Sequence, residues 1–299
     1  MIERLKTWST PVREEGRISV PCALCGGRQF KPSLSCEGFS YVRCLSCALV
    51  QINPQPAVRD VERRYKELYG NEYLLYELGS EAVFLRLQKL ALKDAGFDRI
   101  EEQLLARKDG PPRLLDAGCA TGAMLEFLKN RGWQTVGVEI SPSAVYARNN
   151  RGLEVYNDSL ENCNFPWGSF DVILASHLLE HLNSPAIFLR EVMRTLRPGG
   201  YLILTTPNIG SFQAMFFGSR WRSAIFDHLY LFSKRTLKAM LGSLGFIVEG
   251  VFTWGGLAAG TAPLPLKRFA DKSAKLLGLG DVMVVRARKG FGVQGSGIY

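Results

Sequence analysis

The sequence predicts an α/β protein in which a mostly parallel sheet is covered by helices on both faces and preceded by a small metal-binding module. Two observations predict the sheet: residues 113–122, RLLDAGCATG, have the pattern of a buried strand followed by a tight glycine turn, and four further apolar runs alternate with helical stretches after them. A third observation predicts the module, because two Cys-x-x-Cys pairs stand near the N-terminus.

Length and composition limit the class of protein. With 299 residues, 46% of them hydrophobic, the chain can build one large domain or two smaller ones around a sizeable core. No apolar run reaches the roughly 18 residues of a membrane span. Residues 1–6 lack the apolar core of a signal peptide, and paired cysteines favour metal binding over disulfides. We therefore expect a cytoplasmic protein.

The net charge of +9 is concentrated in the C-terminal part, where residues 211–299 contain twelve Lys or Arg and four Asp or Glu. Such an excess suits nucleic acid, an anionic membrane surface or a phosphorylated substrate. A solvated basic surface is the plain alternative. Because the basic residues are scattered and form no dense run, nucleic acid is not the favoured partner.

The cysteine pairs have the spacing of a zinc site: Cys22 and Cys25 are separated from Cys44 and Cys47 by eighteen residues. Four thiolates close a tetrahedral structural site, and no histidine stands nearby to make a catalytic one. Apolar residues between the pairs predict short strands. Residues 1–56 therefore resemble a zinc ribbon, although an iron site or free thiols, and a role in binding nucleic acid or protein, stay open.

A helical segment is expected between this module and the sheet, over residues 57–110. Pro54 and Pro56 predict an extended connector, residues 58–69 have the pattern of an amphipathic helix, and residues 81–107 that of a long helix interrupted near Gly96. The segment is predicted to serve as a linker or lid, with packing of the ribbon onto the sheet as the alternative.

The glycine turn indicates the kind of ligand. Small residues at Gly118, Ala120 and Gly122 allow a positive φ and close approach of the backbone to a ligand. Dinucleotide-binding turns read G-x-G-x-x-G and hold a pyrophosphate. Here the glycines are four residues apart, and Asp116 would repel a pyrophosphate but attract a cationic amine.

Polar residues stand at the predicted carboxyl ends of the later strands. Glu139 ends a strand at 134–139, about twenty residues after the turn, where an acid suits a ribose. Asp158 follows a strand at 153–156, and Ser176 one at 170–175. A helix at 184–196, a turn at 197–200 and a strand at 201–205 complete the alternation. Because parallel strands end at the same edge of a sheet, these residues are expected to converge.

With these features the chain resembles the class I S-adenosylmethionine (SAM)-dependent methyltransferases, whose first motif reads D-x-G-x-G-x-G, over about residues 110–290. The resemblance implies a Rossmann-like seven-stranded sheet in a domain of residues 111–299, closed by an antiparallel pair at 247–254 and 282–287. It implies SAM as cofactor. The implied cofactor-binding residues are Asp116, Ala117, Gly118, Cys119, Ala120, Gly122, Glu139, Ile140, Asp158, Ser159, Ser176 and His177. Ala120 departs from the family glycine.

With the ribbon in front, the chain resembles zinc-ribbon methyltransferases of bacterial polysaccharide and secondary-metabolite pathways. That resemblance implies transfer of a methyl group to a small-molecule acceptor, such as a hydroxyl of a sugar or a secondary metabolite. Two alternatives stay open. One is an RNA or protein methyltransferase guided by the ribbon and the basic C-terminal part, and the other is a SAM-fold binding protein without activity.

Histidines are the natural bases for a hydroxyl acceptor. His228 lies between the fifth strand and the next helix, where acceptor loops lie in the resembled family, and is the predicted base; the alternative is that it ties this loop to the core. His177 is the second catalytic candidate, as a contact on the cofactor side, and His181 is expected to be structural.

Residues 177–181 also match the H-x-x-E-H pattern of zinc proteases, but they follow a strand end instead of standing within a helix.

The segment 209–226 is aromatic and basic and is predicted to form an acceptor pocket, a lid or a peripheral membrane contact. Residues 257–266 are predicted to be a loop insertion, followed by a basic amphipathic helix. A lipid-linked or phosphorylated acceptor would account for both features.

Overall fold

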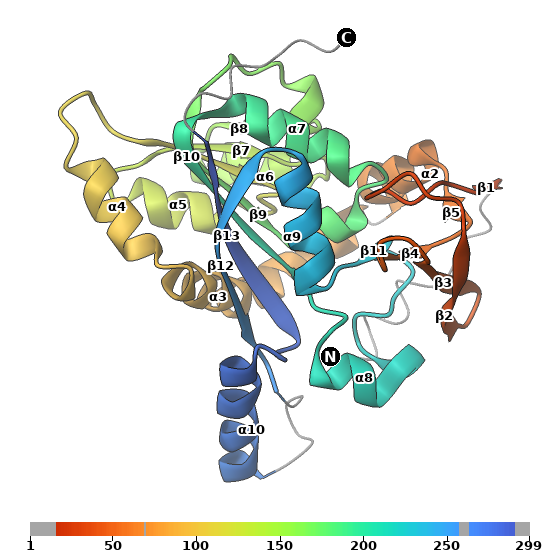
Figure 1. Cartoon of the computed structure of the whole chain (residues 1–299). Coiled ribbons are helices and arrows are strands. Elements are labelled where there is room, and N and C mark those ends of the chain that lie inside the picture. The colour runs from red at the N-terminus through yellow and green to blue at the C-terminus, as the bar shows by residue number, and fades with distance from the viewer. Residues whose placement is uncertain (1–15, 69, 257–262, 291–299) are drawn as a thin grey trace.

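The computed structural model describes residues 16–68, 70–256 and 263–290. It confirms the predicted α/β fold: a seven-stranded sheet has helices on both faces, and a small sheet built from the N-terminal module lies beside it (Figure 1). The predictions for residues 1–6, and most of the loop predicted at 257–266, lie outside the described residues. No helix in the described part of the chain is long and apolar enough to cross a membrane.

The large sheet has the strand order β12-β13-β10-β9-β6-β7-β8. Its strands in chain order are β6 (Arg113–Ala117), β7 (Gln134–Val138), β8 (Val155–Tyr156), β9 (Phe170–Ser176), β10 (Leu196–Pro207), β12 (Phe246–Trp254) and β13 (Val282–Lys289). The central strands are parallel, with Leu115 paired to both Val136 and Ile173, whereas β13 runs antiparallel to β10 and β12. The predicted antiparallel closing pair is therefore confirmed.

One expectation for this sheet is wrong. Residues 197–200 were expected to form a turn before the fifth strand, but β10 begins at Leu196 and runs through them with a shift of register before Tyr201. Gly199 has a φ of 77°. A side chain at Gly200 would lie 2.9 Å from the Arg197 carbonyl and 3.0 Å from that of Asp171. Glycines thus let a bulge continue the strand where the sequence pattern resembles a turn.

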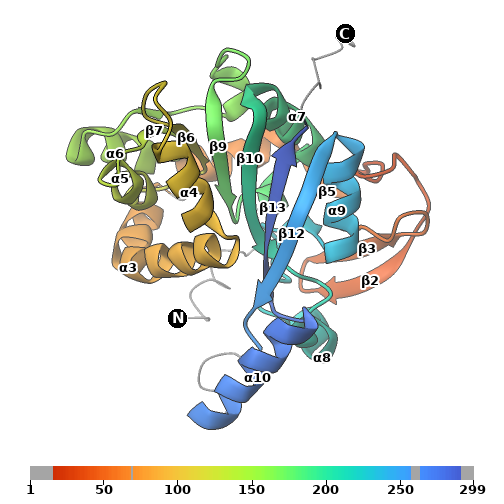
Figure 2. The same ribbon diagram turned by 60° about the vertical axis from the view of Figure 1, so that its left-hand side comes forward.

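The helices divide between the two faces of the sheet (Figure 2). Residues of α3 (Gly70–Asp94), α4 (Phe97–Leu105), α5 (Ala123–Lys129) and α6 (Ser143–Arg151) form one hydrophobic cluster with the sheet. Residues of α7 (Pro185–Thr195) and α9 (Lys234–Ser243) form the other cluster together with the N-terminal module. The remaining elements are α2 (Val58–Arg63), α8 (Phe212–Phe217), α10 (Leu264–Leu277), the π-helix η1 (Arg64–Leu68) and the 3₁₀ turns η2 (Leu160–Asn162), η3 (Leu179–His181) and η4 (Gly218–Arg220).

The predicted break near Gly96 is confirmed, because Gly96 separates α3 from α4 with a φ of 73°. The single helix expected over residues 58–69 is corrected: α2 ends at Arg63 and the chain continues as η1, whose wider i→i+5 turns change the direction of the side chains that follow.

The N-terminal module contains β2 (Phe30–Cys36), β3 (Phe39–Cys44) and β4 (Val50–Ile52), and a strand from a distant part of the chain, β11 (Tyr230–Leu231), completes its sheet in the order β11-β4-β3-β2. Another short pair joins β1 (Arg17–Ile18) to β5 (Gln55–Pro56). Tyr41, Leu49 and Val50 belong to the same hydrophobic cluster as α7 and β10. The domain boundaries near residues 56 and 110 stay predictions.

The packing of β7 supports a test of stability. A Cβ at Gly137 would lie 2.6 Å from Cys119 Sγ and Leu125 Cδ1, on a strand buried on both sides. We expect Gly137→Ala to lower the free energy of unfolding by about 1–3 kcal/mol, as overpacking does, measured by denaturant unfolding. In the control Gly242→Ala, whose new methyl group meets nothing within 4 Å on α9, stability should stay equal or rise. Equal stability of both variants would contradict the packing.

Candidate functional site

The glycine turn after β6 is shaped by its backbone conformation and by one acid. Gly118, Ala120 and Gly122 have φ values of 73°, 48° and 81°. The Ala120 amide donates to Oε2 of Glu139 at 3.1 Å, and the Ser141 amide donates to Oε1 of the same carboxylate at 2.8 Å. Glu139 therefore ties the turn to the end of β7, while Ala120 adopts the left-handed conformation usual for glycine.

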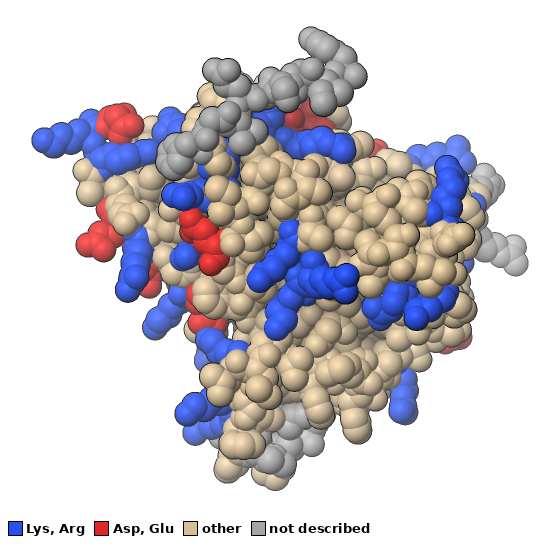
Figure 3. Space-filling view, viewed as in Figure 1, with Lys and Arg blue, Asp and Glu red and all other residues tan. Residues whose placement is uncertain are grey.

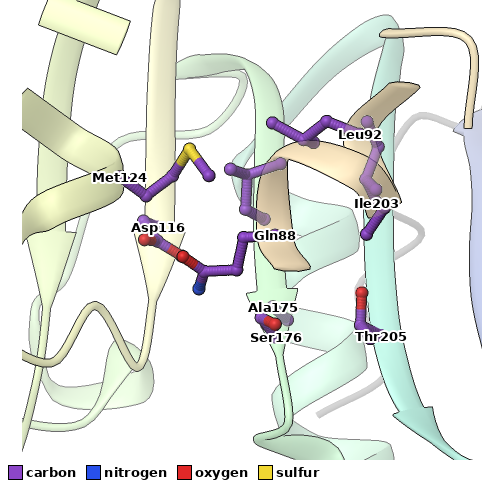
Figure 4. A pocket seen from close by; sticks show the side chains of 10 residues that line it. Gln88, Leu92, Asp116, Met124, Ala175, Ser176, Ile203 and Thr205 are labelled. Atoms are coloured by element: carbon purple, nitrogen blue, oxygen red, sulfur yellow. The ribbon is translucent and has the colours of Figure 1, made fainter. Parts of the chain in front are cut away.

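Asp116, at the end of β6, is buried and has an oxygen, Oδ2, that lacks a hydrogen-bond partner. Burial, and then the charge of Glu139, raises the pKa of Asp116 to about 7. Figure 4 shows this carboxyl group beside Gln88 of α3, at a cavity that Ser176 and Thr205 also line. A buried acid without a full set of partners, beside a cavity, suits a cationic group of a ligand.

A second acid from the predicted lid lies close by. Glu77, on α3, is buried, accepts a hydrogen bond from the Ser143 hydroxyl and has Tyr73 as a further hydrogen-bond partner. Burial, and then the charge of Glu139, raises the pKa of Glu77 to about 8. The sequence gives no signal for this residue, because nothing in the helical pattern distinguishes it from the other acids of the same helix.

The structure brings most of the predicted cofactor-binding residues to one edge of the sheet. Ser176 lines the same cavity as Asp116. Asp158, after β8, accepts hydrogen bonds from the Ser159 amide and the Asn162 side chain, both at 2.8 Å, and these bonds lower its pKa. The Cys119 side chain is buried in the core, with its sulfur 2.6 Å from where a Cβ of Gly137 would lie. Any contact of Cys119 with a ligand would therefore be made by its backbone. The assignment of these residues to SAM stays a prediction.

The residues at this edge fit SAM, which carries a positive charge on its amine and another on its sulfonium. Asp116 lines a cavity, and its unpartnered Oδ2 can accept a hydrogen bond from an amine. A Cβ at Gly118 would meet the Leu178 side chain at 3.4 Å, so the turn presents backbone instead of a side chain.

A cluster of histidines lies next to this edge. His177 follows β9 with a φ of 51° and has its Nδ1 3.2 Å from Oε1 of Glu180. Glu180 is fully buried and accepts a hydrogen bond of 2.9 Å from Thr206. Burial alone would raise the pKa of Glu180, but a hydrogen bond from His177 and the charges of the nearby histidines lower it to about 2. Glu180 is therefore an ionised, buried carboxylate.

His181 and His228 lie edge to face with ring centroids 4.7 Å apart. His181 Nδ1 is 2.8 Å from the hydroxyl of Tyr65, and His228 Nδ1 is 2.8 Å from the carbonyl of Ser223. Since a carbonyl only accepts, Nδ1 of His228 holds the proton and Nε2 holds the lone pair. Burial, and then His181, lowers the pKa of His228 to about 4, so the ring is neutral near pH 7.

The structure does not form the protease site that residues 177–181 resemble in sequence. These residues span the end of β9 and the short turn η3 instead of a helix. Within the described residues, the metal-ligand cluster found here joins Glu180 and His181 to His228, with ligand atoms within 4.8 Å of one another, and leaves out His177. The paired histidines that such a protease needs are therefore not brought together.

The four cysteines of the module converge. Sγ of Cys22 lies 3.3 Å from that of Cys47, Sγ of Cys25 lies 3.5 Å from that of Cys44, and all four are within 4.8 Å of one another. A Cβ at Gly27 would lie 3.3 Å from the Cys25 sulfur, so a glycine leaves room for the cluster. Four thiols in this arrangement fit a closed tetrahedral zinc site. Zinc itself stays a prediction.

Comparison with known proteins identifies the family. The model of a family described as "Methyltransferase domain" matches residues 88–250, more than half of the chain, so the chain belongs to that family. This match confirms the predicted class of enzyme, a SAM-dependent methyltransferase. The matched region contains the glycine turn and the histidine at position 228, whereas the four cysteines lie outside it.

Curated relatives are similar over part of the chain. A ubiquinone biosynthesis O-methyltransferase of Xanthomonas oryzae pv. oryzae is 35% identical over 103 residues, which are 32% of this chain and 43% of the relative. A probable SAM-dependent methyltransferase of Mycolicibacterium smegmatis is 30% identical over 164 residues, which are 52% and 61% of the two chains. This chain thus spans less than half the length of the ubiquinone enzyme.

Among solved structures, a SAM-dependent methyltransferase from Archaeoglobus fulgidus has a TM-score of 0.50 and 21% identity, covering 72% of this chain and 99% of its own. This likeness supports the fold.

The unpartnered acid at the turn predicts how SAM affinity depends on pH. Because the pKa of Asp116 is raised and a cationic ligand favours its ionised form, SAM affinity should increase as pH rises from about 5.5 to 8. Asp116→Asn should weaken SAM binding by about ten- to a hundredfold, because it removes the binding free energy of a charge-assisted hydrogen bond. It should also make the affinity for SAM less dependent on pH. Calorimetric titration with SAM measures both effects.

The control for this titration is Asp98→Asn, an exposed acid of α4. It should leave the affinity for SAM and its dependence on pH as in the wild type. An Asp116→Asn protein that binds SAM as tightly as this control would show that the turn acid does not contact the cofactor.

Proposed function

We propose that the protein transfers a methyl group from SAM to a hydroxyl of a small-molecule acceptor, such as a sugar or a secondary metabolite. One observation supports this proposal above the others: Ser176 lines the cavity beside the unpartnered acid Asp116, and His177, the next residue, contacts Glu180 of the cluster that contains the neutral base His228. The similarity to ubiquinone biosynthesis O-methyltransferases supports an oxygen atom of a small molecule as the acceptor.

Methyl transfer to a hydroxyl is an in-line displacement in which an oxygen–carbon bond forms while a sulfonium–carbon bond breaks. SAM, when bound, supplies the electrophilic methyl group and its sulfur leaving group. What the protein must supply is alignment of the two reactants, exclusion of water and a base for the hydroxyl proton.

In the proposed mechanism, Nε2 of His228 accepts the hydroxyl proton. Its Nδ1–H is held by the Ser223 carbonyl, which presents the correct tautomer. The low pKa of the free ring, about 4, makes it a weak base by itself. The ionised Glu180 lies within the same cluster and stabilises the positive charge that forms on the imidazole during the transfer.

The negative groups of the cofactor side have a binding role in this proposal. Asp116 binds a cationic group of SAM in its ionised form, and Glu139 holds the glycine turn in shape while facing the ribose. Asp158 and Ser159 are the proposed contacts of the adenine, and His177, half exposed beside Ser176, is a proposed contact near the sulfonium.

The surface around α8 and α10 supports a lipid-linked acceptor at an anionic membrane. The start of α8 lies beside the residues that follow α10, because the Phe212 amide donates to the Leu279 carbonyl at 3.0 Å. Six large apolar side chains on them are half to largely exposed: Phe212, Met215, Phe216, Phe269, Leu276 and Leu277. Arg268 and Lys272 are exposed on the same helix α10, and Figure 3 shows Lys and Arg side chains outnumbering acidic ones over α9 and α10. Apolar side chains framed by basic ones suit the interface of an anionic bilayer.

Turnover tests the base. We expect His228→Gln to keep the wild-type affinity for SAM and to lower kcat by about a hundredfold or more, the usual contribution of a general base. Isotope-labelled SAM and mass spectrometry of the metabolite pool methylated by the purified enzyme identify the acceptor and measure the rate. His177→Gln is the matched comparison and should change SAM affinity more than kcat. Wild-type turnover by His228→Gln would contradict the assignment.

Vesicle binding tests the membrane surface. The protein should co-sediment with vesicles containing phosphatidylglycerol, bind pure phosphatidylcholine weakly and dissociate at high salt. Phe216→Ser with Leu276→Ser should lower this binding by about tenfold or more, since each removes an apolar side chain that would enter the bilayer. The control Leu75→Ser with Phe84→Ser changes exposed apolar residues of α3. An equal loss of vesicle binding in both double variants would contradict a membrane-binding role of this surface. Salt-dependent affinity for RNA, without vesicle binding, would favour the alternative of an RNA methyltransferase.

A further inference from the structure

The ribbon and the segment that carries His228 share one sheet. β4 pairs antiparallel with β11, with Gln51 opposite Tyr230 and Val50 opposite Leu231, and the Ile52 amide donates to the Leu229 carbonyl at 2.9 Å. The N-terminal module therefore holds the backbone that directly follows His228, although more than 170 residues separate the two in sequence.

A buried tyrosine of the ribbon holds the backbone that precedes this strand. The hydroxyl oxygen of Tyr41 lies 2.8 Å from the carbonyl of Ile225 and 2.8 Å from that of His228, and its single proton is shared between them. The same turn is closed by the His228 amide, which donates to Ile225 at 3.1 Å. Tyr41 has no exposed surface, so no water replaces its hydroxyl in this position.

The residues between these carbonyls are also held by the N-terminal part of the chain. The Phe226 ring packs edge to face on Phe39 at 5.5 Å, and the Arg64 guanidinium lies 4.7 Å from the centre of the same ring. Arg64 also forms a buried ion pair with Asp227. Three consecutive residues, 226–228, are thus each held by a side chain from residues 39–64.

The cysteine cluster determines the geometry of these contacts. Tyr41 lies on β3, three residues before Cys44, whose amide donates to the Leu49 carbonyl at the start of β4. The Gln51 side chain accepts from the Ala23 amide and donates to the Pro21 carbonyl, both at 3.2 Å, which ties β4 to the first cysteine pair. Both cysteine pairs are therefore directly connected to the strands that hold the segment.

We propose that the ribbon is a positioning element of the acceptor site: metal held by the four cysteines orders β3 and β4, and these strands hold residues 225–231, and with them the His228 imidazole, through Tyr41 and the β4–β11 pairing. This inference rests on the proposed role of His228. Tyr41 is a positioning residue, since it contacts the backbone of His228 and not its ring. The proposed cofactor residues of β6 and β7 belong to the seven-stranded sheet, whose strands do not pair with those of the ribbon, so SAM binding is expected to be independent of it.

The test is hydrogen exchange of the full chain, compared between wild type, Tyr41→Phe and Tyr156→Phe. Tyr41→Phe leaves two buried carbonyls without their shared donor, and the amides of residues 225–231 should exchange at least about tenfold faster. Amides of β6 and β7 and the affinity for SAM should stay unchanged. Tyr156→Phe removes an exposed hydroxyl bonded to Glu154 and serves as the matched control with wild-type exchange throughout.

Metal removal is the second arm. Wild-type protein is expected to contain one zinc ion per chain by elemental mass spectrometry, and a chelator should raise exchange at 225–231 while β6 and β7 stay protected. The proposed role of the metal would be overturned if the purified protein contained no bound metal. It would also be overturned if chelator-treated protein showed unchanged hydrogen exchange at residues 225–231. Wild-type exchange at 225–231 in Tyr41→Phe would overturn the positioning role of the ribbon.

These readouts separate the inference from the function on which it rests. Accelerated exchange in Tyr41→Phe together with wild-type turnover in His228→Gln would reject the base while supporting the link between the ribbon and this segment. Loss of turnover in His228→Gln together with unchanged exchange in Tyr41→Phe would support the base and reject the link.

Discussion

The cost of burying carboxylates determines which edge of the sheet can bind a ligand. At one edge Asp171, at the start of β9, is fully compensated: it lies 2.8 Å from the Arg107 guanidinium and 2.9 Å from that of Arg197, and accepts from the Arg113 amide at 2.8 Å. At the carboxyl edge Asp116 has an oxygen without a partner. A buried acid that its own chain leaves uncompensated is stabilised by a cation from outside. The fold thus pairs Asp171 with partners of its own chain at one edge of the sheet. At the carboxyl edge it leaves an oxygen of Asp116 available to a ligand.

The same principle explains the arrangement around that edge. Glu139 accepts hydrogen bonds from two backbone amides and so shapes the turn, whereas burial, and then the charge of Glu139, raises the pKa values of Asp116 and Glu77. The histidine cluster differs: interactions with His177 and the other histidines outweigh burial and lower the pKa of Glu180 to about 2, whereas burial, and then His181, lowers the pKa of His228 to about 4. In the proposed function, binding of a cation and uptake of a proton belong to these two different clusters.

The part of the chain shared with the methyltransferase family, residues 88–250, contains the glycine turn, whereas the N-terminal module and the whole of α10 lie outside it. This division fits an enzyme in which the sheet binds a common methyl donor and added elements determine the acceptor. In this chain the ribbon is joined to the sheet domain by strand pairing and a shared core instead of a flexible connection. The influence on the acceptor side that we propose for it would therefore be a consequence of packing.

Local chemistry made much of the site predictable from the sequence alone. Three features depend only on neighbours close in sequence and can therefore be recognised in one sequence. They are the acid and small residues at 116–122, the acid that follows the next strand and the spacing of the four cysteines. Contacts between distant segments leave no such pattern. Only the tertiary structure decided four further features, because each requires two parts of the chain that meet after folding. They are the pairing of β4 with β11, the hydroxyl of Tyr41 between two carbonyls, the burial of Glu77 against Ser143 and the run of β10 through residues 197–200.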